Sequence, residues 1–245
     1  MPFTLSHAAL VLPTTFLPKK MYSITGLLIG SFVPDFEYFI RMRDYSIYSH
    51  TKLGIFWFDV PLGILLAFVY HNLVRNALLE NLPNHLYLRI LPFRRFDWEE
   101  YFKKNWFVVV ISIIIGAASH IFWDGFTHWN GYFVRHIPFL RRYMMIMGSP
   151  FSYYNLAQHF STIVGGFIII IFMYKLPQSP QGETTKQRHQ GSYWPFVFGI
   201  SILILLLRIF SGLNYKSFDQ VIVNAISGGI MALIVMPVFF RSKYQ

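Results

Sequence analysis

Long apolar runs alternate with short polar segments along most of the chain. Several runs stay apolar for about 20 residues, the length that an α-helix needs to cross the hydrocarbon core of a bilayer. The pattern therefore predicts an all-α fold, a polytopic bundle of membrane helices with about six full spans and a short inserted N-terminal helix. The predicted spans are residues 22–40, 54–74, 106–126, 158–174, 193–210 and 220–240, and the short apolar helix covers residues 3–17.

Neither an internal repeat nor a soluble domain interrupts this pattern, so residues 1–245 are predicted to form a single integral membrane domain. Small residues, Gly26, Gly30 and the run from Gly116 to Ser119, favour close helix packing. Between the spans, residues 75–104 form the most charged linker and residues 127–156 an aromatic loop that is re-entrant or lies on the surface. The domain divides into four parts. Residues 1–131 hold the candidate metal site, and residues 132–176 hold an aromatic loop and a span. Residues 177–192 form a flexible loop with Pro and Gly, and residues 193–245 hold two C-terminal spans.

Composition supports the membrane assignment and narrows the chemistry. Hydrophobic residues make up 54% of the chain and charged residues 13%, about half the charged fraction of soluble domains. The net charge of +10 comes from Lys and Arg in short loops between apolar runs, a membrane pattern that excludes a nucleic-acid-binding stripe. Cysteine is absent, so any metal must be held by His, Asp or Glu. Lys19 and Lys20 follow the first apolar stretch, unlike the basic start of a cleavable signal peptide.

The stretch from Ser119 to His128 carries the strongest chemical motif. His120 and Asp124 are four residues apart, so on a helix they project from one face and can ligate one cation. His128 lies two turns further, about 12 Å along an unbroken helix. All three reach one ion only if the helix breaks, for which Gly125 is the candidate. The alternative is an interfacial helix end, where aromatic and polar residues gather.

Counting the spans places most ionisable residues of the apolar runs on one side of the membrane. Such residues are expensive in lipid and are functional candidates. His71 is an exception, predicted to be structural. More Lys and Arg fall on the opposite side, which makes that side cytoplasmic and the cluster extracytoplasmic. The residues assigned to the common side are His7, Asp35, Glu37, His50, Asp59, His120, Asp124, His128 and His159.

The opening Met-Pro-Phe-Thr-Leu-Ser-His-Ala resembles an uncharacterised bacterial membrane family, filed as a domain of unknown function. That family is similar to the membrane-bound, metal-dependent hydrolases known as LexA-binding and inner-membrane-associated. Their ordered motifs match His7, Pro34 to Glu37, Ser49-His50, and Ser119-His120 with Asp124, over residues 1 to 131. Glu37 replaces an Asp, and the first His of the His-rich turn is missing, which removes one possible ligand for a second metal. The resemblance implies a hydrolase of the bacterial inner membrane, more remotely like zinc-dependent phospholipase C.

Both arguments give the same candidate residues. A divalent cation, zinc first, is expected to be held by five ligands, and Glu37 is the candidate general base, although an ion pair with Arg41 explains it equally well. Asp59 and His159 are predicted to orient ligand rings, and His128 either ligates or donates to a substrate phosphate. His85, His136 and His189 are predicted to be solvated loop residues. The five predicted ligands are His7, Asp35, His50, His120 and Asp124.

Three functions fit these observations. The first is a metal-dependent hydrolase of an ester or phosphoester, with an aromatic surrounding that favours a lipid-like substrate and a water activated by the metal. The second is a non-catalytic membrane protein whose cluster is a structural metal site or polar staple. The third is an ion-coupled transporter, against which the sequence has no inverted repeat. In each case the expected partner is the lipid bilayer.

Overall fold

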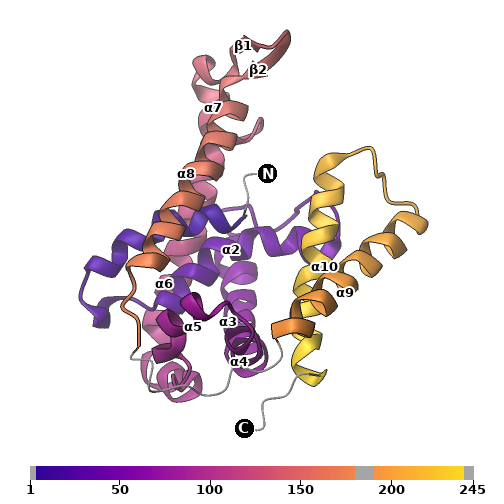
Figure 1. Ribbon diagram of the computed structural model, residues 1–245. Coiled ribbons are helices and arrows are strands. Elements are labelled where there is room, and N and C mark those ends of the chain that lie inside the picture. Colours follow the sequence, from indigo (N-terminus) through magenta and orange to yellow (C-terminus); the bar gives the residue numbers. More distant parts are fainter. Residues whose placement is uncertain (1–3, 180–189, 240–245) are drawn as a thin grey trace. The chain divides into compact units, whose positions relative to one another are not determined.

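The computed structural model describes residues 4–179 and 190–239 (Figure 1). His189, the residues Met1 to Phe3 of the N-terminal motif and most of the predicted flexible loop at 177–192 lie outside the described residues. Helices dominate the described part of the chain, which supports the predicted all-α class. The α-helices are α1 (Ala8–Val11), α2 (Ile24–Arg41), α3 (Val60–Val69), α4 (Arg75–Glu80), α5 (Asn84–Ile90), α6 (Trp98–Thr127), α7 (Tyr132–His136), α8 (Tyr153–Lys175), α9 (Gln190–Phe210) and α10 (Phe218–Phe239).

Shorter helical turns and one hairpin complete the secondary structure. Single turns of 3₁₀-helix are η1 (Thr4–His7), η2 (Leu12–Phe16), η3 (Lys19–Met21), η6 (Leu91–Phe93) and η7 (Pro138–Arg141). Two π-helical turns, η4 (Ile55–Asp59) and η5 (Tyr70–Val74), flank α3. The hairpin is made of strands β1 (Tyr143–Ile146) and β2 (Ser149–Ser152).

Five helical segments of the described chain are long and apolar enough to cross a membrane, which supports an integral membrane protein. They are Ile55–Glu80, Trp98–His136, Tyr153–Lys175, Gly191–Phe210 and Phe218–Phe239. The remaining predicted span, residues 22–40, forms α2, which is not apolar enough to count as a membrane-crossing helix. Its 18 residues include Asp35, Glu37 and Arg41, and three charges in so short a helix lower its hydropathy. The count of full spans is therefore five among the described residues, where the sequence predicted six.

The chain divides into two compact units. The first contains the described parts of Met1–Asp35, Ile47–Ile64 and Asn105–Ile171. In it, α2 and α6 pack with their backbones in close contact, as the small residues predicted. A Cβ added at Gly30 would lie 2.4 Å from the Ile113 carbonyl oxygen, and one at Gly116 would lie 2.5 Å from that of Leu27. Only glycine allows this approach, which brings the end of the first-unit part of α2 beside the last turns of α6.

The predicted aromatic loop at 127–156 has more structure than expected. Helix α6 ends at Thr127, and α7, η7 and the β1–β2 hairpin follow. The strands pair antiparallel, with Tyr143 opposite Ser152 and Ile146 opposite Ser149. Met147 and Gly148 form the two-residue turn with φ of 49° and 81°, and two positive φ angles match the twist of a hairpin. A non-glycine residue at the first position hid this turn from the sequence pattern.

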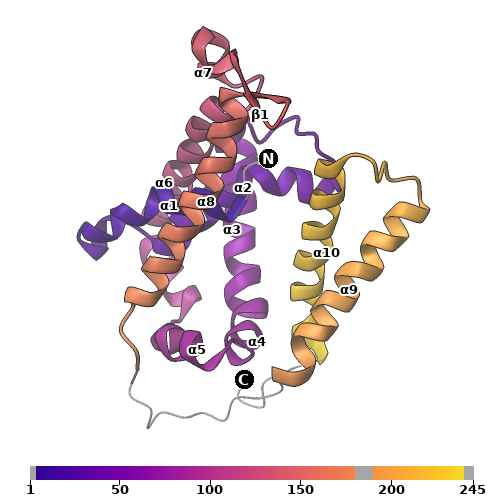
Figure 2. The same ribbon diagram turned by 45° about the horizontal axis from the view of Figure 1, so that its top comes forward.

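The second unit contains Phe36–Ser46, Leu65–Lys104 and the described parts of Phe172–Gln245. Its helices α9 and α10 lie side by side (Figures 1 and 2). The predicted charged linker at 75–104 folds into α4, α5, η6 and the first turns of α6, which then kinks at Asn105, just before the predicted start of the span. A buried apolar cluster holds this unit together. It consists of Ala77, Tyr193, Val197, Ala232 and Met236.

Candidate metal centre

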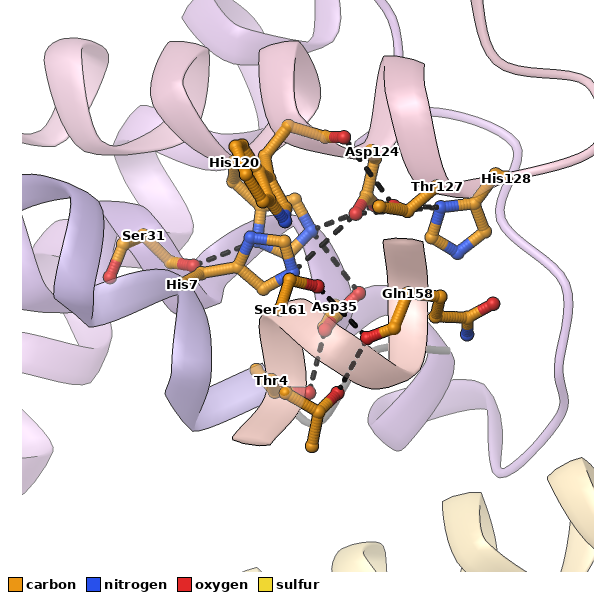
Figure 3. Close-up of polar contacts among 12 residues, drawn as sticks. Thr4, His7, Ser31, Asp35, His120, Asp124, Thr127, His128, Gln158 and Ser161 are labelled. Carbon is orange, nitrogen blue, oxygen red and sulfur yellow. Dashed lines mark hydrogen bonds and ion pairs between the residues drawn. The ribbon is translucent and has the colours of Figure 1, made fainter. Parts of the chain in front are cut away.

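Four polar side chains from three segments of the first unit converge on one point. Asp35 comes from α2, His50 from the loop between α2 and η4, and His120 and Asp124 from α6. One ligand atom of each lies within 4.8 Å of the others. Figure 3 shows three of these residues, Asp35, His120 and Asp124, turned toward one another. Asp35 and His120, which are 85 positions apart in sequence, therefore lie side by side. The order of the predicted spans placed both residues on the same side of the membrane.

Four of the six distances between these atoms, those from each imidazole to each carboxylate, are close to the edges of a tetrahedral metal site. His120 Nε2 lies 3.4 Å from Asp35 Oδ1 and 3.2 Å from Asp124 Oδ2. His50 Nε2 lies 3.7 Å from Asp35 Oδ1 and 3.5 Å from Asp124 Oδ2. Four ligands at 2.0–2.1 Å from a zinc ion in tetrahedral geometry stand about 3.3–3.4 Å apart. Direct hydrogen bonds between the same atoms would be about 2.7–2.9 Å long, so the spacing fits a shared cation better than ion pairing.

His120 is oriented by the backbone of α2. Its Nδ1 lies 2.8 Å from the Ser31 carbonyl oxygen, which can only accept, so Nδ1 carries the proton and donates. This tautomer leaves the lone pair on Nε2, the atom that faces the two carboxylates and makes no hydrogen bond. The ring is fully buried. Such a carbonyl partner on the second nitrogen is typical of metal-binding histidines.

The atoms of His50 and Asp35 that face away from the centre also have polar partners. Ser49 Oγ lies 3.0 Å from His50 Nδ1, and the Thr4 hydroxyl donates to Asp35 Oδ2 at 2.6 Å. Each residue thus presents one atom to the centre and is held through the other. The exposed fraction of the His50 side chain is 20%, against 3% for Asp35, so the cluster reaches solvent on the His50 side.

His7 lies beside the four residues instead of completing their set. Its ring stacks on that of His120, with centroids 3.8 Å apart and planes 22° apart. Its Nε2 lies 3.4 Å from Asp124 Oδ1, the oxygen that does not face His120. Burial lowers the pKa of His7 below its usual range, which favours the neutral imidazole that metals bind.

His128 reaches the cluster without a break in the helix. The His128 amide donates to the Asp124 carbonyl at 3.0 Å, so the helical turn continues past Gly125, contrary to the expected break. His128 Nδ1 lies 3.4 Å from Asp124 Oδ1 and 3.3 Å from Thr127 Oγ1. Figure 3 shows Asp124 between His120 and His128. The Asp124 carboxylate lies between His120 and His128 and contacts both rings, so no kink is needed to connect them.

Three other predicted residues have different surroundings. Glu37 is buried and accepts from Arg41 Nε at 2.8 Å, the alternative that the sequence left open. It lies two positions after Asp35, so the two side chains point about 200° apart around α2. Asp59 is fully buried at the end of η4, whereas His159 is exposed on α8. His71 stacks on Trp98 with centroids 4.6 Å apart, in keeping with a structural role.

The groups that orient the candidate ligands, two hydroxyls and one backbone carbonyl, were not among the residues predicted from the sequence. Thr4 stands one turn before His7, so helical spacing could have indicated it, whereas Ser31 acts through its backbone carbonyl, which side-chain spacing does not indicate. Ser49 is the neighbour of a predicted ligand. Polar residues at such positions were present in the motifs but carried no assigned role.

One family model matches almost the whole chain. No curated protein and no solved structure shows a significant match. The matching model covers residues 1–238 and is described as a domain of unknown function, DUF4184. Since the match spans far more than half of the sequence, the chain belongs to the family of domains of unknown function DUF4184.

Proposed function

We propose that this protein is a membrane-embedded, metal-dependent hydrolase that cleaves an ester or phosphoester bond. The observation that carries the proposal is the convergence of one ligand atom each from Asp35, His50, His120 and Asp124 within 4.8 Å of one another, with each imidazole 3.2–3.7 Å from each carboxylate. Two carboxylates that are buried together need compensating positive charge. A divalent cation supplies it without requiring that both imidazoles be protonated.

The ligand set favours zinc. Two imidazole nitrogens and two carboxylate oxygens are a donor set that suits this ion, whereas calcium and magnesium take six or more oxygen ligands. When bound, the ion would lower the pKa of a water molecule and polarise the oxygen of the scissile bond. The side chains provide the holding and the orientation, through Ser31, Ser49 and Thr4 behind the ligands.

A lipid-like substrate is the second part of the proposal. Large aromatic side chains are exposed on α6 and on the segments that directly follow α6 and the His50 loop, including Phe56, Trp57, Phe122, Trp129 and Tyr132. Such rings favour amphiphilic molecules at the edge of a bilayer. Two candidate spans, Ile55–Glu80 and Trp98–His136, separate His50 from the end of α6, and two crossings return the chain to its starting side. With the Lys and Arg distribution, this supports a site on the extracytoplasmic side of a bacterial inner membrane.

Glu37 is left out of the proposed chemistry because its carboxylate pairs with Arg41. Two imidazoles at this site are partly exposed. The side chain of His50, one of the four converging residues, is 20% exposed, and that of His128, which contacts Asp124, is 27% exposed. A substrate that enters from solvent or from the headgroup layer meets these two rings first. His128 is therefore the residue of the cluster that is best placed to contact a substrate oxygen.

One observation favours a second candidate function, a structural metal site. Four protein ligands complete the tetrahedral coordination of zinc, and structural zinc sites are closed in this way, whereas catalytic sites keep a position open. In this alternative the ion fastens α2, the His50 loop and α6 together, and the protein catalyses no hydrolysis.

Metal content and turnover together separate the candidates. Purified protein in detergent is analysed for bound metal and assayed with p-nitrophenyl esters and bis-p-nitrophenyl phosphate, with His120→Ala as the test and His136→Ala, an exposed histidine, as the matched control. The hydrolase proposal predicts that His120→Ala loses the metal and at least 99% of turnover, while His136→Ala keeps both. Metal-dependent stability without turnover on any substrate supports the structural site, and metal-free wild-type protein contradicts both.

A further inference from the structure

Asp124 faces ligand atoms on two sides, and only one side belongs to the four-residue set. Its Oδ2 lies 3.2 Å from His120 Nε2 and 3.5 Å from His50 Nε2. Its Oδ1 lies 3.4 Å from His7 Nε2 and 3.4 Å from His128 Nδ1. His120, Asp124 and His128 stand four apart in sequence, so the carboxylate lies between two imidazoles, one on α6 and one directly after its last residue.

The atoms on the Oδ1 side lack the hydrogen bonds that buried polar groups normally make. Asp124 Oδ1 and both ring nitrogens of His7 are buried without a hydrogen-bond partner, and His7 as a whole is 1% exposed. Leaving such groups unsatisfied costs about 1–3 kcal/mol each. The ring of His7 is held in place by stacking on His120, and its Nε2 is turned toward Asp124.

His128 provides the outer edge of this group. The Thr127 hydroxyl also lies 3.3 Å from His128 Nδ1, which is longer than a typical hydrogen bond of about 2.7–3.2 Å. That hydroxyl lies 3.4 Å from the Trp123 carbonyl as well, so neither of its contacts is short. The His128 side chain is 27% exposed, which leaves this edge open.

We propose that Asp124 bridges two divalent cations, the second of which is held by His7 Nε2, His128 Nδ1 and Asp124 Oδ1. This inference rests on the proposed function, because it takes the first cation to be the one held by Asp35, His50, His120 and Asp124. The two 3.4 Å separations to Asp124 Oδ1 match the edge of about 3.3–3.4 Å in a tetrahedral site. A bridging carboxylate is consistent with the spacing of about 3.5–4 Å between the ions of two-metal hydrolytic sites.

The two positions differ in what they offer to a substrate. The first has four protein ligands and so resembles a closed structural site, whereas the second has three and keeps a position open on the His128 side. The second cation is thus the one that contacts a substrate oxygen, and the first one fixes the helices around it. With this division of roles, the four-ligand position is structural and the three-ligand position is catalytic, as is usual for zinc sites with these ligand numbers.

The number of bound ions and their coupling test the proposal. Full-length protein in detergent is dialysed against zinc and analysed for metal per chain, and a Mn²⁺-loaded sample is examined by electron paramagnetic resonance. Wild-type protein and the control His136→Ala are expected to bind two zinc ions and to give the exchange-coupled signal of neighbouring Mn²⁺ ions. His128→Ala, a change at a partly exposed ring, is expected to bind one ion and to give the signal of isolated Mn²⁺.

His7→Gln gives a second, independent loss of the same ion, with circular dichroism as the check that both variants fold. One zinc in wild-type protein and one in His128→Ala overturns the bridged pair and leaves the proposed function standing. Two zinc ions in His128→Ala and His7→Gln also overturn it, because the second ion is then held elsewhere. Failure of wild-type protein to bind any metal overturns the proposed function together with this inference.

Discussion

Buried acidic residues occur in both units of the molecule, and their neighbours differ. In the second unit, Glu37 pairs with Arg41 at 2.8 Å and Glu80 with Arg94 at 2.5 Å. In the first unit, Asp35 and Asp124 face imidazoles, at distances of 3.2–3.7 Å. Arginine is always charged, so the acids of the second unit carry their counter-ions with them.

The same contrast separates two buried histidines. His71 of the second unit stacks on Trp98, and its Nδ1 lies 3.1 Å from Arg75 Nη1. A cationic neighbour repels a metal ion, and an aromatic face offers it no lone pair. His120 of the first unit instead turns Nε2 to two carboxylates. Burial of a histidine therefore indicates little by itself, and the charge of its neighbours distinguishes a ligand from a packed ring.

Removal of the metal is expected to have the largest effect. A chelator should destabilise wild-type protein by about 4 kcal/mol relative to protein in free zinc at 1,000 times the Kd, because zinc binds the folded state alone. Thermal unfolding in detergent, followed by circular dichroism with and without chelator, measures this change. The double variant Asp35→Asn/Asp124→Asn serves as the control and should not respond. A wild-type melting temperature that is indifferent to chelator contradicts the metal assignment.

Removing an acid from each unit should have different effects once the metal is gone. Glu80→Gln removes the charged partner of Arg94 and is expected to lower stability by about 3 kcal/mol, with the metal content unchanged. Asp124→Asn should abolish metal binding, and in chelator it should cost less stability than Glu80→Gln, because the imidazoles around Asp124 can lose their protons whereas Arg94 stays charged. Chemical or thermal unfolding of both variants in chelator measures the difference. Equal destabilisation by the two changes would remove the distinction between the units.

The close packing of α2 on α6 sets the distance between Asp35 and His120. Gly30→Ala places a Cβ 2.4 Å from the Ile113 carbonyl, which forces the helices apart and is expected to cost about 1–3 kcal/mol and about tenfold in zinc affinity. Gly166→Ala on α8 is the matched control, because a Cβ there meets nothing within 4 Å. Competition with a fluorescent zinc chelator reports the affinity. An unchanged affinity for Gly30→Ala shows that the site does not depend on this contact.

The groups behind the ligands should have the smallest effect. Thr4→Val keeps the shape of the side chain but removes the donor to Asp35 Oδ2, and loss of such a partner weakens metal binding by about tenfold or somewhat more. Thr15→Val removes a hydroxyl that donates to the Leu12 carbonyl and should leave the affinity unchanged. The same competition assay compares the two. Equal affinities of the two variants indicate that Asp35 needs no support from Thr4.

Much of the fold and of the candidate metal site follows from local spacing in the sequence. Apolar runs of about 20 residues gave the helices, and the i, i+4 rule put His120 and Asp124 on one face. Asp35 and Glu37 are two residues apart, so helical spacing places them on opposite faces of α2. The same spacing places Glu37 beside Arg41, four residues further on, so their ion pair could be predicted from the sequence. The meeting of His50 with Asp124 followed from the order of the spans alone.

Other features depend on contacts that spacing does not encode. The tautomer of His120 is set by the Ser31 carbonyl, a backbone atom placed by the packing of α2 on α6. The two faces of Asp124 appear only when the rings of His7 and His128 are in position. The hydropathy of α2 is too low for a full span because the helix contains Asp35, Glu37 and Arg41. Burial of the two acids within the protein keeps them away from lipid.

The coordination of the bound ion tests the central claim most directly. X-ray absorption at the zinc K-edge, on purified wild-type protein and on His120→Ala, reports the ligand atoms and their distances. The account predicts a first shell of nitrogen and oxygen at about 2.0–2.1 Å with outer-shell imidazole scattering in wild-type protein, and no such signal in His120→Ala. Zinc that is absent from wild-type protein, or whose shell lacks imidazole scattering, contradicts it.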